Sequence, residues 1–328
     1  MPEISLLQPR ILLGVVQSFL TDVSPSLRGL TLLGPGRGDL NPTWEYDMIR
    51  GARDRSTPNA PNAEAHRRDH LIYRKLTGSY IYLRDKKTFN PTTLRWLREP
   101  GNTAVTRGAA ERAVMMELLD LENAQKRYME YVTWAMFTGA YTYTHTGGGT
   151  TAVDYLIQAS HKPTASPVWA AAGDDPIGNI QAWKQLITRD AGATPTTVYL
   201  NNTTMTKFIK LPEVISQLSD RQKQVYTTEG MVPRFMGLDW IEYDGGYVES
   251  STYYPFIADD KLIIVAPENN PWEMRFGPSA DHEAPPGTTG AFSKSWLEPD
   301  PSNRQVLLEK NFMPILTRPD HVVYASVA

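Results

Sequence analysis

The stretch ERAVMMELLDLENAQKRYMEYVTWAMFTG, residues 111–139, contains no proline and no glycine until its last position. Its apolar side chains recur every three or four residues, which places them on one face of a helix: Val114, Leu118, Leu121, Tyr128, Val132 and Ala135. Extended back to the threonines near Val105, this pattern predicts a helix of roughly thirty residues or more, on the order of 50 Å long. Ordinary globular helices are shorter.

Charged residues decide which kind of long helix this is. A membrane span requires about twenty predominantly apolar residues in a row. Six charged side chains exclude it: Glu117, Asp120, Glu122, Lys126, Arg127 and Glu130. A coiled coil is disfavoured because Gln125 interrupts the heptad seam. We predict a strut whose inner face packs on a sheet and whose outer face is solvated, with Glu122–Lys126 and Lys126–Glu130 as ion pairs on the helix.

The composition indicates a globular protein. The chain has 328 residues with 41% hydrophobic content, 33 basic and 36 acidic residues, a net charge of -3 and no cysteine. Disulfides, thiolate metal sites and cysteine nucleophiles are therefore excluded. Residues 11–20 (ILLGVVQSFL) are apolar, but Arg10 is the only basic residue before them, whereas a signal peptide begins with a basic region. We therefore interpret them as an amphipathic arm.

The charge is unevenly distributed. Residues 50–98 hold twelve basic and four acidic residues and carry +8, while the rest of the chain carries -11. Nucleic-acid binding is one use of such a segment, with Tyr73, Tyr80 and Tyr82 as stacking surfaces, although tyrosines also fit ordinary cross-strand packing. We favour self-association, because copies of one chain with this asymmetry attract one another.

The remaining pattern predicts an α+β protein. Residues 44–49 alternate as a half-buried strand, and two apolar runs around Thr77–Ser79 predict a β-hairpin that turns at Gly78. This basic excursion is expected to lie on a partner subunit, because isolated hairpins are marginally stable. A second hairpin is expected around Gly147–Gly149, and a helix beginning at Pro176.

Strands are further expected near residues 196–202, 237–248 and 261–267, with a helix capped by Asn202 or Thr203 after the first of them. Asp244 is assigned to a turn. The C-terminal tail alternates again and is expected to pair back onto the first part of the chain.

Candidate chemical motifs are weak. His66, Asp69 and His70 resemble an inverted zinc-protease motif, but their segment follows a proline-rich turn and enters a strand. The glycines of residues 34–38 form a turn without the features of a phosphate loop, and residues 281–283 are expected to be a solvated loop. We predict no catalytic, cofactor-binding or metal-binding residues.

Three longer pieces in this order carry a resemblance to a known family: WAAAGDDPIGNIQAW (169–183), DWIEYDGGY (239–247), and WLEPDPS through FMPILTRPD (296–320). With the basic hairpin and the long helix, they resemble the lambda-like E family of tailed-phage major capsid proteins over nearly the whole chain. The resemblance implies the HK97-like capsid fold. Its expected parts are an N-terminal arm (1–44), an extended β-hairpin loop (45–100), a peripheral domain with a long spine helix (101–170), an axial α+β domain (171–285) and a return to the peripheral domain (286–328).

The resemblance also implies a function. Copies would assemble as hexamers and pentamers into an icosahedral phage head around double-stranded DNA, bound without sequence specificity. Assembly would take place in the host cytoplasm, with a scaffold, a portal and in some cases a decoration protein as partners and no membrane. Alternatives are an encapsulin-like compartment of the same fold, and a metal hydrolase using His66, Asp69 and His70. Ten residues of the extended loop are expected at the subunit interface: Arg50, Arg53, Arg55, Arg67, Arg68, Arg74, Lys75, Arg84, Lys86 and Lys87.

Overall fold

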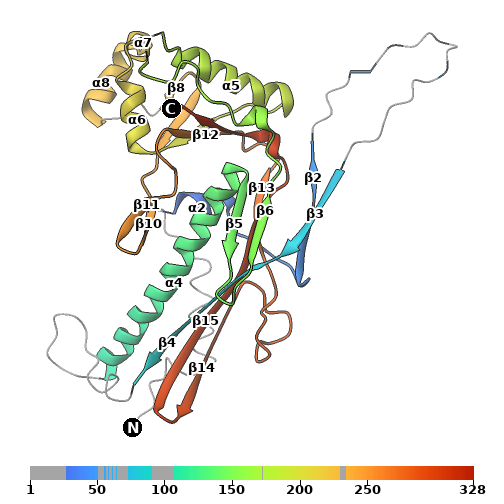
Figure 1. The fold of residues 1–328 in the computed structure, drawn as a ribbon, viewed down its shortest axis with the longest axis vertical. Coiled ribbons are helices and arrows are strands. Elements are labelled where there is room, and N and C mark those ends of the chain that lie inside the picture. The colour runs from blue at the N-terminus through green and yellow to red at the C-terminus, as the bar shows by residue number, and fades with distance from the viewer. Residues whose placement is uncertain are drawn as a thin grey trace. The chain divides into compact units, whose positions relative to one another are not determined.

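The computed structural model describes residues 27–50, 55–56, 58, 61, 64, 73–90, 107–171, 173–229 and 234–328. The chain forms two compact units. The first unit contains Met1–Glu45, Thr77–Val132 and Glu273–Pro314, and the second contains Tyr46–Leu76, Thr133–Trp272 and Ile315–Ala328. Figure 1 shows their helices and strands.

The predicted long helix is confirmed as α4 (Arg107–Thr138), a single helix of 32 residues. Val114, Leu118, Leu121 and Val132 on its apolar stripe are buried. The predicted solvated outer face is wrong at three positions, because Glu122, Lys126 and Glu130 are buried as well. Glu122 and Glu130 lie against polar partners from distant segments, and Lys126 lies 3.6 Å from Glu122, which confirms the ion pair predicted between them. These charged residues therefore belong to the packed side of the helix.

One of those partners is the short helix α2 (Arg28–Leu33). The Glu130 carboxylate accepts hydrogen bonds from the backbone N–H groups of Gly29 at 2.7 Å and Leu30 at 2.8 Å. First-turn N–H groups have no hydrogen-bond acceptor within their own helix, so the Glu130 carboxylate supplies the missing acceptor.

The first unit is built around the long strand β15 (Ser302–Leu316). It pairs antiparallel with β14 (Ala291–Pro299) on one side and with β4 (Ile81–Phe89) on the other. The same sheet includes β13 (Trp272–Phe276), to which the two-residue strand β1 (Arg37–Gly38) adds in parallel. Because β15 pairs with β4, this part of the tail pairs back onto an earlier part of the chain, as expected.

The predicted hairpin turn at Gly78 is wrong. Residue 78 lies inside β3 (Tyr73–Ser79), which pairs with β2 (Thr43–Ile49), and the chain continues through buried Tyr80 directly into β4. The Trp44 ring lies over Gly78, where a Cβ would be 2.5 Å from a ring carbon. Glycine is therefore needed for close packing against the tryptophan and not for a turn.

The second unit contains a five-stranded sheet of order β16-β12-β7-β9-β8. Its strands are β7 (Thr197–Leu200), β8 (Arg234–Phe235), β9 (Leu238–Glu242), β12 (Lys261–Val265) and β16 (Val322–Ser326). Four helices accompany it: α5 (Pro176–Asp190), α6 (Asn202–Ile209), α7 (Pro212–Gln217) and α8 (Asp220–Glu229). Trp169, Trp183, Phe208, Trp240 and Leu262 belong to their shared core. Because β16 pairs with β12, the end of the tail lies in this unit.

Local signals fix several boundaries in the second unit. Asp175 caps α5 by accepting the Gly178 N–H, as the acidic residues before Pro176 predict. The next helix is capped by Asn201, whose side chain accepts the Thr204 N–H, so the expected caps Asn202 and Thr203 are wrong by one or two positions. The predicted glycine-rich hairpin is confirmed as β5 (Ala140–Thr144) and β6 (Thr150–Asp154).

The remaining elements are short. Strands β10 (Gly246–Glu249) and β11 (Thr252–Pro255) form a separate antiparallel hairpin. The described residues of the second unit also include the 3-10 helices η2 (Ala159–His161) and η3 (Pro319–His321). Asp244 does more than serve its turn, since its carboxylate accepts the Asn202 N–H at 2.8 Å.

Candidate subunit interface

The ten basic residues expected at an interface do not share one environment. Arg53, Arg67 and Arg68 lie outside the described residues. Arg50, Arg55, Arg74, Lys75 and Lys86 are exposed. Arg84 and Lys87 are engaged by acidic groups of their own chain. The basic segment therefore divides into a part bound within the chain and a part that faces solvent.

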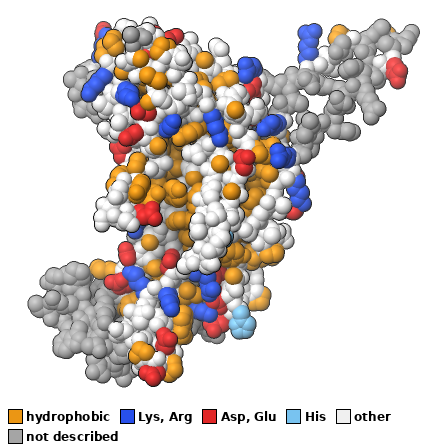
Figure 2. Space-filling model, in the orientation of Figure 1, with side chains coloured by type: hydrophobic (Ala, Val, Ile, Leu, Met, Phe, Trp, Pro, Cys, Tyr) orange, Lys and Arg blue, Asp and Glu red, His pale blue; other side chains and the backbone are white. Residues whose placement is uncertain are grey.

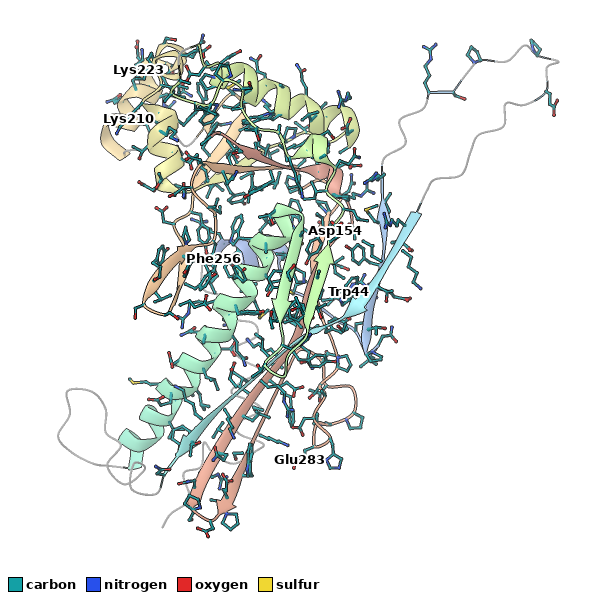
Figure 3. The ribbon with its side chains drawn as sticks, in the orientation of Figure 1. Trp44, Asp154, Lys210, Lys223, Phe256 and Glu283 are labelled. Atoms are coloured by element: carbon teal, nitrogen blue, oxygen red, sulfur yellow. The ribbon has the colours of Figure 1, made fainter. Side chains whose placement is uncertain are left out.

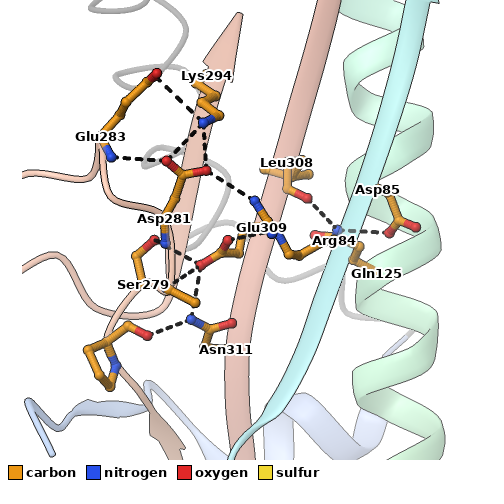
Figure 4. A network of polar contacts seen from close by, with 12 residues as sticks. Arg84, Asp85, Gln125, Ser279, Asp281, Glu283, Lys294, Leu308, Glu309 and Asn311 are labelled. Atoms are coloured by element: carbon orange, nitrogen blue, oxygen red, sulfur yellow. Dashed lines mark hydrogen bonds and ion pairs between the residues drawn. The ribbon is translucent and has the colours of Figure 1, made fainter. Parts of the chain in front are cut away.

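Arg84 lies at the centre of a polar network on the first unit's sheet (Figure 4). Its guanidinium is 3.1 Å from a carboxylate oxygen of Asp281 and 3.1 Å from one of Glu309 on β15. The Lys294 ammonium on β14 lies 2.7 Å from Asp281. The Asp281 and Glu309 side chains are 4% and 1% exposed, so these carboxylates require nearby cations or donors.

The same network fixes the loop that follows β13. Glu309 accepts hydrogen bonds from the Ser279 hydroxyl and the Ala280 N–H, each at 2.8 Å. Burial would raise the pKa of Asp281, but hydrogen bonds from Lys294 and the Glu283 N–H, with the charges of Lys294 and Arg84, outweigh it and hold that pKa below its usual value. The expectation of a solvated loop at residues 281–283 is thus wrong for Asp281.

Lys87 joins β4 to helix α4. Its ammonium donates to Glu117 at 2.5 Å and to Asp120 at 2.9 Å. Burial lowers the pKa of Lys87, but the two carboxylates outweigh this and raise it overall. Both carboxylates are at least half exposed, so this bridge contributes little to stability compared with a buried pair.

Two further contacts on this sheet were not predicted from the sequence. Gln125 donates to the Asp85 carboxylate at 2.9 Å, and Lys310 on β15 donates to Glu122 at 2.5 Å with both side chains 1% exposed. Burial lowers the pKa of Lys310 while Glu122 opposes that shift. Gln125 itself is the sequence signal for these contacts. A polar residue on an otherwise apolar stripe indicates polar contacts buried under the helix, and not an interruption of its packing.

Exposed basic residues lie directly after β2, on β3 and on β4. Arg50 contacts the carbonyl oxygen of Leu156 at 3.3 Å. Arg74 on β3 and Lys86 on β4 are exposed, and within the described parts of the chain neither has an ion pair. Their role at a subunit interface stays a prediction.

The metal-hydrolase alternative depends on His66, Asp69 and His70, which lie outside the described residues. In the described ranges, no group of three or more histidine, aspartate or glutamate side chains is arranged to hold a metal ion. Over the same part of the chain, no helix is both long and apolar enough to cross a membrane.

Solved structures with the same fold define the class of protein. A prophage capsid protein from Escherichia coli superposes with a TM-score of 0.68 at 15% identity, covering 96% of this chain and 99% of that one. A phage-related protein from Bordetella bronchiseptica gives 0.53 at 10% identity over 96% and 97% of the two chains. The capsid of the cyanophage P-SCSP1u gives 0.50 at 10% identity over 89% and 86%. The chain has the HK97-like fold of shell-forming capsid proteins.

The match to a protein-family model identifies which kind of capsid protein this is. The model of the phage major capsid protein E family matches residues 36–327, and the chain belongs to this family. No curated protein sequence matches it significantly. It is therefore a capsid-forming structural protein of a bacteriophage rather than an enzyme, it is part of the virion, and many copies of it assemble into a shell. The family match makes the encapsulin-like alternative the weaker one.

Proposed function

We propose that copies of this chain assemble as hexamers and pentamers into an icosahedral head that encloses double-stranded DNA. Membership of the major capsid family carries this proposal. DNA would be held without sequence specificity, since the net charge of -3 gives the whole chain no general affinity for phosphate. A scaffold, a portal and a decoration protein would act with it in the host cytoplasm.

We assign the contact between neighbouring copies to the basic side chains of the extended loop. Exposed Arg50, Arg55, Arg74, Lys75 and Lys86 support this assignment, together with the sequence positions Arg53, Arg67 and Arg68. Arg84 and Lys87 contribute by fixing β4 against the sheet and α4. Attraction between a +8 segment and a -11 remainder favours contact between copies and weakens as salt screens it.

The test is assembly of the purified protein, measured by size-exclusion chromatography and negative-stain electron microscopy. Rings, sheets or closed shells are expected, and a variant that reverses Arg67, Arg68 and Arg74 to glutamate should lose them while keeping its thermal unfolding temperature. Equal particle yield from this variant would contradict the interface assignment. Particles that package a protein instead of DNA during infection would contradict the DNA-containing head.

A further inference from the structure

A small cavity lies within the first unit, between helix α4, the residues that follow α2, and strands β13 and β15. Its volume is about 50 Å³. Such a space has room for about four water molecules, at roughly 10–15 Å³ for each. Four apolar side chains and two ammonium groups contribute to its lining: Leu30, Met129, Met274, Phe276, Lys126 and Lys310.

Close packing preforms one wall of the cavity. A Cβ added to Gly36 would lie 2.3 Å from a ring carbon of Phe276, so the backbone of the loop after α2 rests directly on this ring. A larger residue at position 36 would push the loop away from β13. The cavity is therefore bounded by packed backbone and side chains, and its shape does not depend on a ligand.

Lys310 lacks acceptors for most of its ammonium group. Its side chain is 1% exposed, and within the described chain it donates one hydrogen bond, to Glu122 Oε1 at 2.5 Å. An ammonium has three N–H donors, so two of them have no acceptor from the described residues. Surface cations reach water and, as Figure 2 shows on one face, lie among acidic side chains. A buried charge is stable only when it is fully hydrogen-bonded, so the cavity has to supply further acceptors.

The cavity has a positive character. Lys126 and Lys310 are both part of its lining, whereas no aspartate or glutamate among the described residues lines it. Glu122 lies against the two ammonium groups, 3.6 Å from Lys126 and 2.5 Å from Lys310, and Figure 3 shows side chains of α4 and β15 reaching toward each other. Glu130 is bound by the N–H groups of Gly29 and Leu30. The acceptor that best matches this space is therefore an anion.

Size limits the class of anion. A cavity of about four waters accommodates a halide with one or two water molecules beside it. Sulfate and phosphate have five heavy atoms each and four oxygens that require donors, and the side-chain donors of the described lining are the two ammonium groups. Glu122 already offsets one of these two cations. A small anion of single charge therefore fits the cavity better than a divalent oxyanion.

We propose that this cavity is a binding site for one small monovalent anion, such as chloride, which accepts hydrogen bonds from the Lys310 ammonium and lies beside Lys126. The bound ion would hold α4, the loop after α2 and the strands β13 and β15 together, so it would stabilise the folded chain. Burial lowers the pKa of Lys310, Glu122 opposes this shift and the charge of Lys126 adds to it. A second anion next to Lys310 would favour its charged form.

A chloride titration of the full-length chain tests the proposal. Sodium chloride replaces sodium gluconate at constant ionic strength, because gluconate is too large for the cavity, and thermal unfolding is followed by circular dichroism. Chloride at ten times its dissociation constant should raise the ratio of folded to unfolded chain about tenfold and the unfolding temperature by about 2–4 °C, with saturation at higher chloride. An unfolding temperature that is equal in the two salts would show that water alone fills the cavity, and would overturn the proposal.

A pair of variants assigns the effect to this site. Lys310→Met should lose the chloride-dependent rise in unfolding temperature. Lys294→Met is the matched control, because it removes an ammonium that is bound by Asp281 at 2.7 Å and Glu283 at 3.7 Å in the same unit, outside the cavity. Figure 3 labels Glu283 on its loop, away from helix α4. The control should be less stable than the wild type but keep the rise. A rise of wild-type size in Lys310→Met would place the ion elsewhere and overturn the proposal.

Bromide locates the ion directly and does not depend on the folding of a variant. Crystals of the wild-type chain soaked in sodium bromide should show an anomalous peak inside the cavity, in contact with the Lys310 ammonium. Anomalous peaks confined to the protein surface would overturn the proposal. Each of these measurements leaves the proposed function untouched, because none of them depends on assembly of the shell.

Discussion

β3 and β4 are separated by a single residue and both carry basic side chains, but their surroundings differ. β4 is a strand of the five-stranded sheet, and its Arg84 and Lys87 are bound by four carboxylates of the same chain. Among the described strands β3 pairs with β2 alone, and its Arg74 is exposed. One basic run in the sequence therefore has two environments, an internal clamp at Arg84 and Lys87 and an exposed cation at Arg74, because neighbouring elements decide which charges are neutralised within the chain.

The largest loss of stability is expected from removing a buried cation on β15, the strand that pairs with β4. Lys310→Met should lower the free energy of unfolding by about 3 kcal/mol, the lower end of the range for breaking a buried ion pair, because the buried Glu122 carboxylate loses its partner at 2.5 Å and keeps Lys126 at 3.6 Å. Urea unfolding followed by circular dichroism measures this change. The double variant Glu122→Gln/Lys310→Met should lose less than the sum of the single variants, and strict additivity would show that the pair does not interact.

A smaller effect is expected where β3 passes under Trp44. Gly78→Ala should cost about 1–3 kcal/mol, because the new methyl group would overlap the tryptophan ring and force it or the strand to shift. Tryptophan fluorescence during urea unfolding reports on this site. Gly147→Ala is the control, since nothing lies near its Cβ position. Equal stability of the two variants would contradict the packing role of Gly78.

The clamp on β4 also predicts a pH dependence. Since the pKa of Asp281 is lowered in the folded state, its contribution is present above the unfolded pKa of about 3.9 and is lost as pH falls below that value. Asp281→Asn should cost about 1–2 kcal/mol at pH 7, in the range for hydrogen bonds to charged groups. The difference between wild type and variant should shrink in unfolding measurements as pH approaches 3. A difference that stays constant from pH 7 to 3 would contradict the ion-pair explanation.

The smallest effects sharpen the contrast between the two strands. Lys87→Gln should cost less than about 1 kcal/mol, because its carboxylate partners are largely exposed. Arg74→Gln should leave the thermal unfolding temperature unchanged, because Arg74 has no ion pair within the described chain. Calorimetry measures the unfolding temperature of both variants and so separates the two effects. Destabilisation by Arg74→Gln as large as that by Lys87→Gln would show that both strands use their cations internally.

Much of the interface could not be located from the sequence. The basic segment itself is evident from the sequence by counting charges, and an acidic surface as its partner stays a prediction from the same count. The assignment of Arg84 to Asp281 and Glu309 is not evident, because these residues are separated by about two hundred positions and meet only through the register of β4 on β15. The same applies to Gln125, whose partner Asp85 comes from that strand.

Elements with local signals could be predicted from the sequence: α4 from its apolar period, α5 from Asp175 and Pro176, and the β5–β6 hairpin from its glycines. These depend on contacts between residues a few positions apart. Tertiary packing was needed to show that Glu122, Lys126 and Glu130 face inward, and that Gly78 makes room for Trp44 instead of turning the chain. Burial of a charge or loss of a side chain is stable only beside a particular distant partner, and that partner is set by strand order and register, which local pattern does not encode.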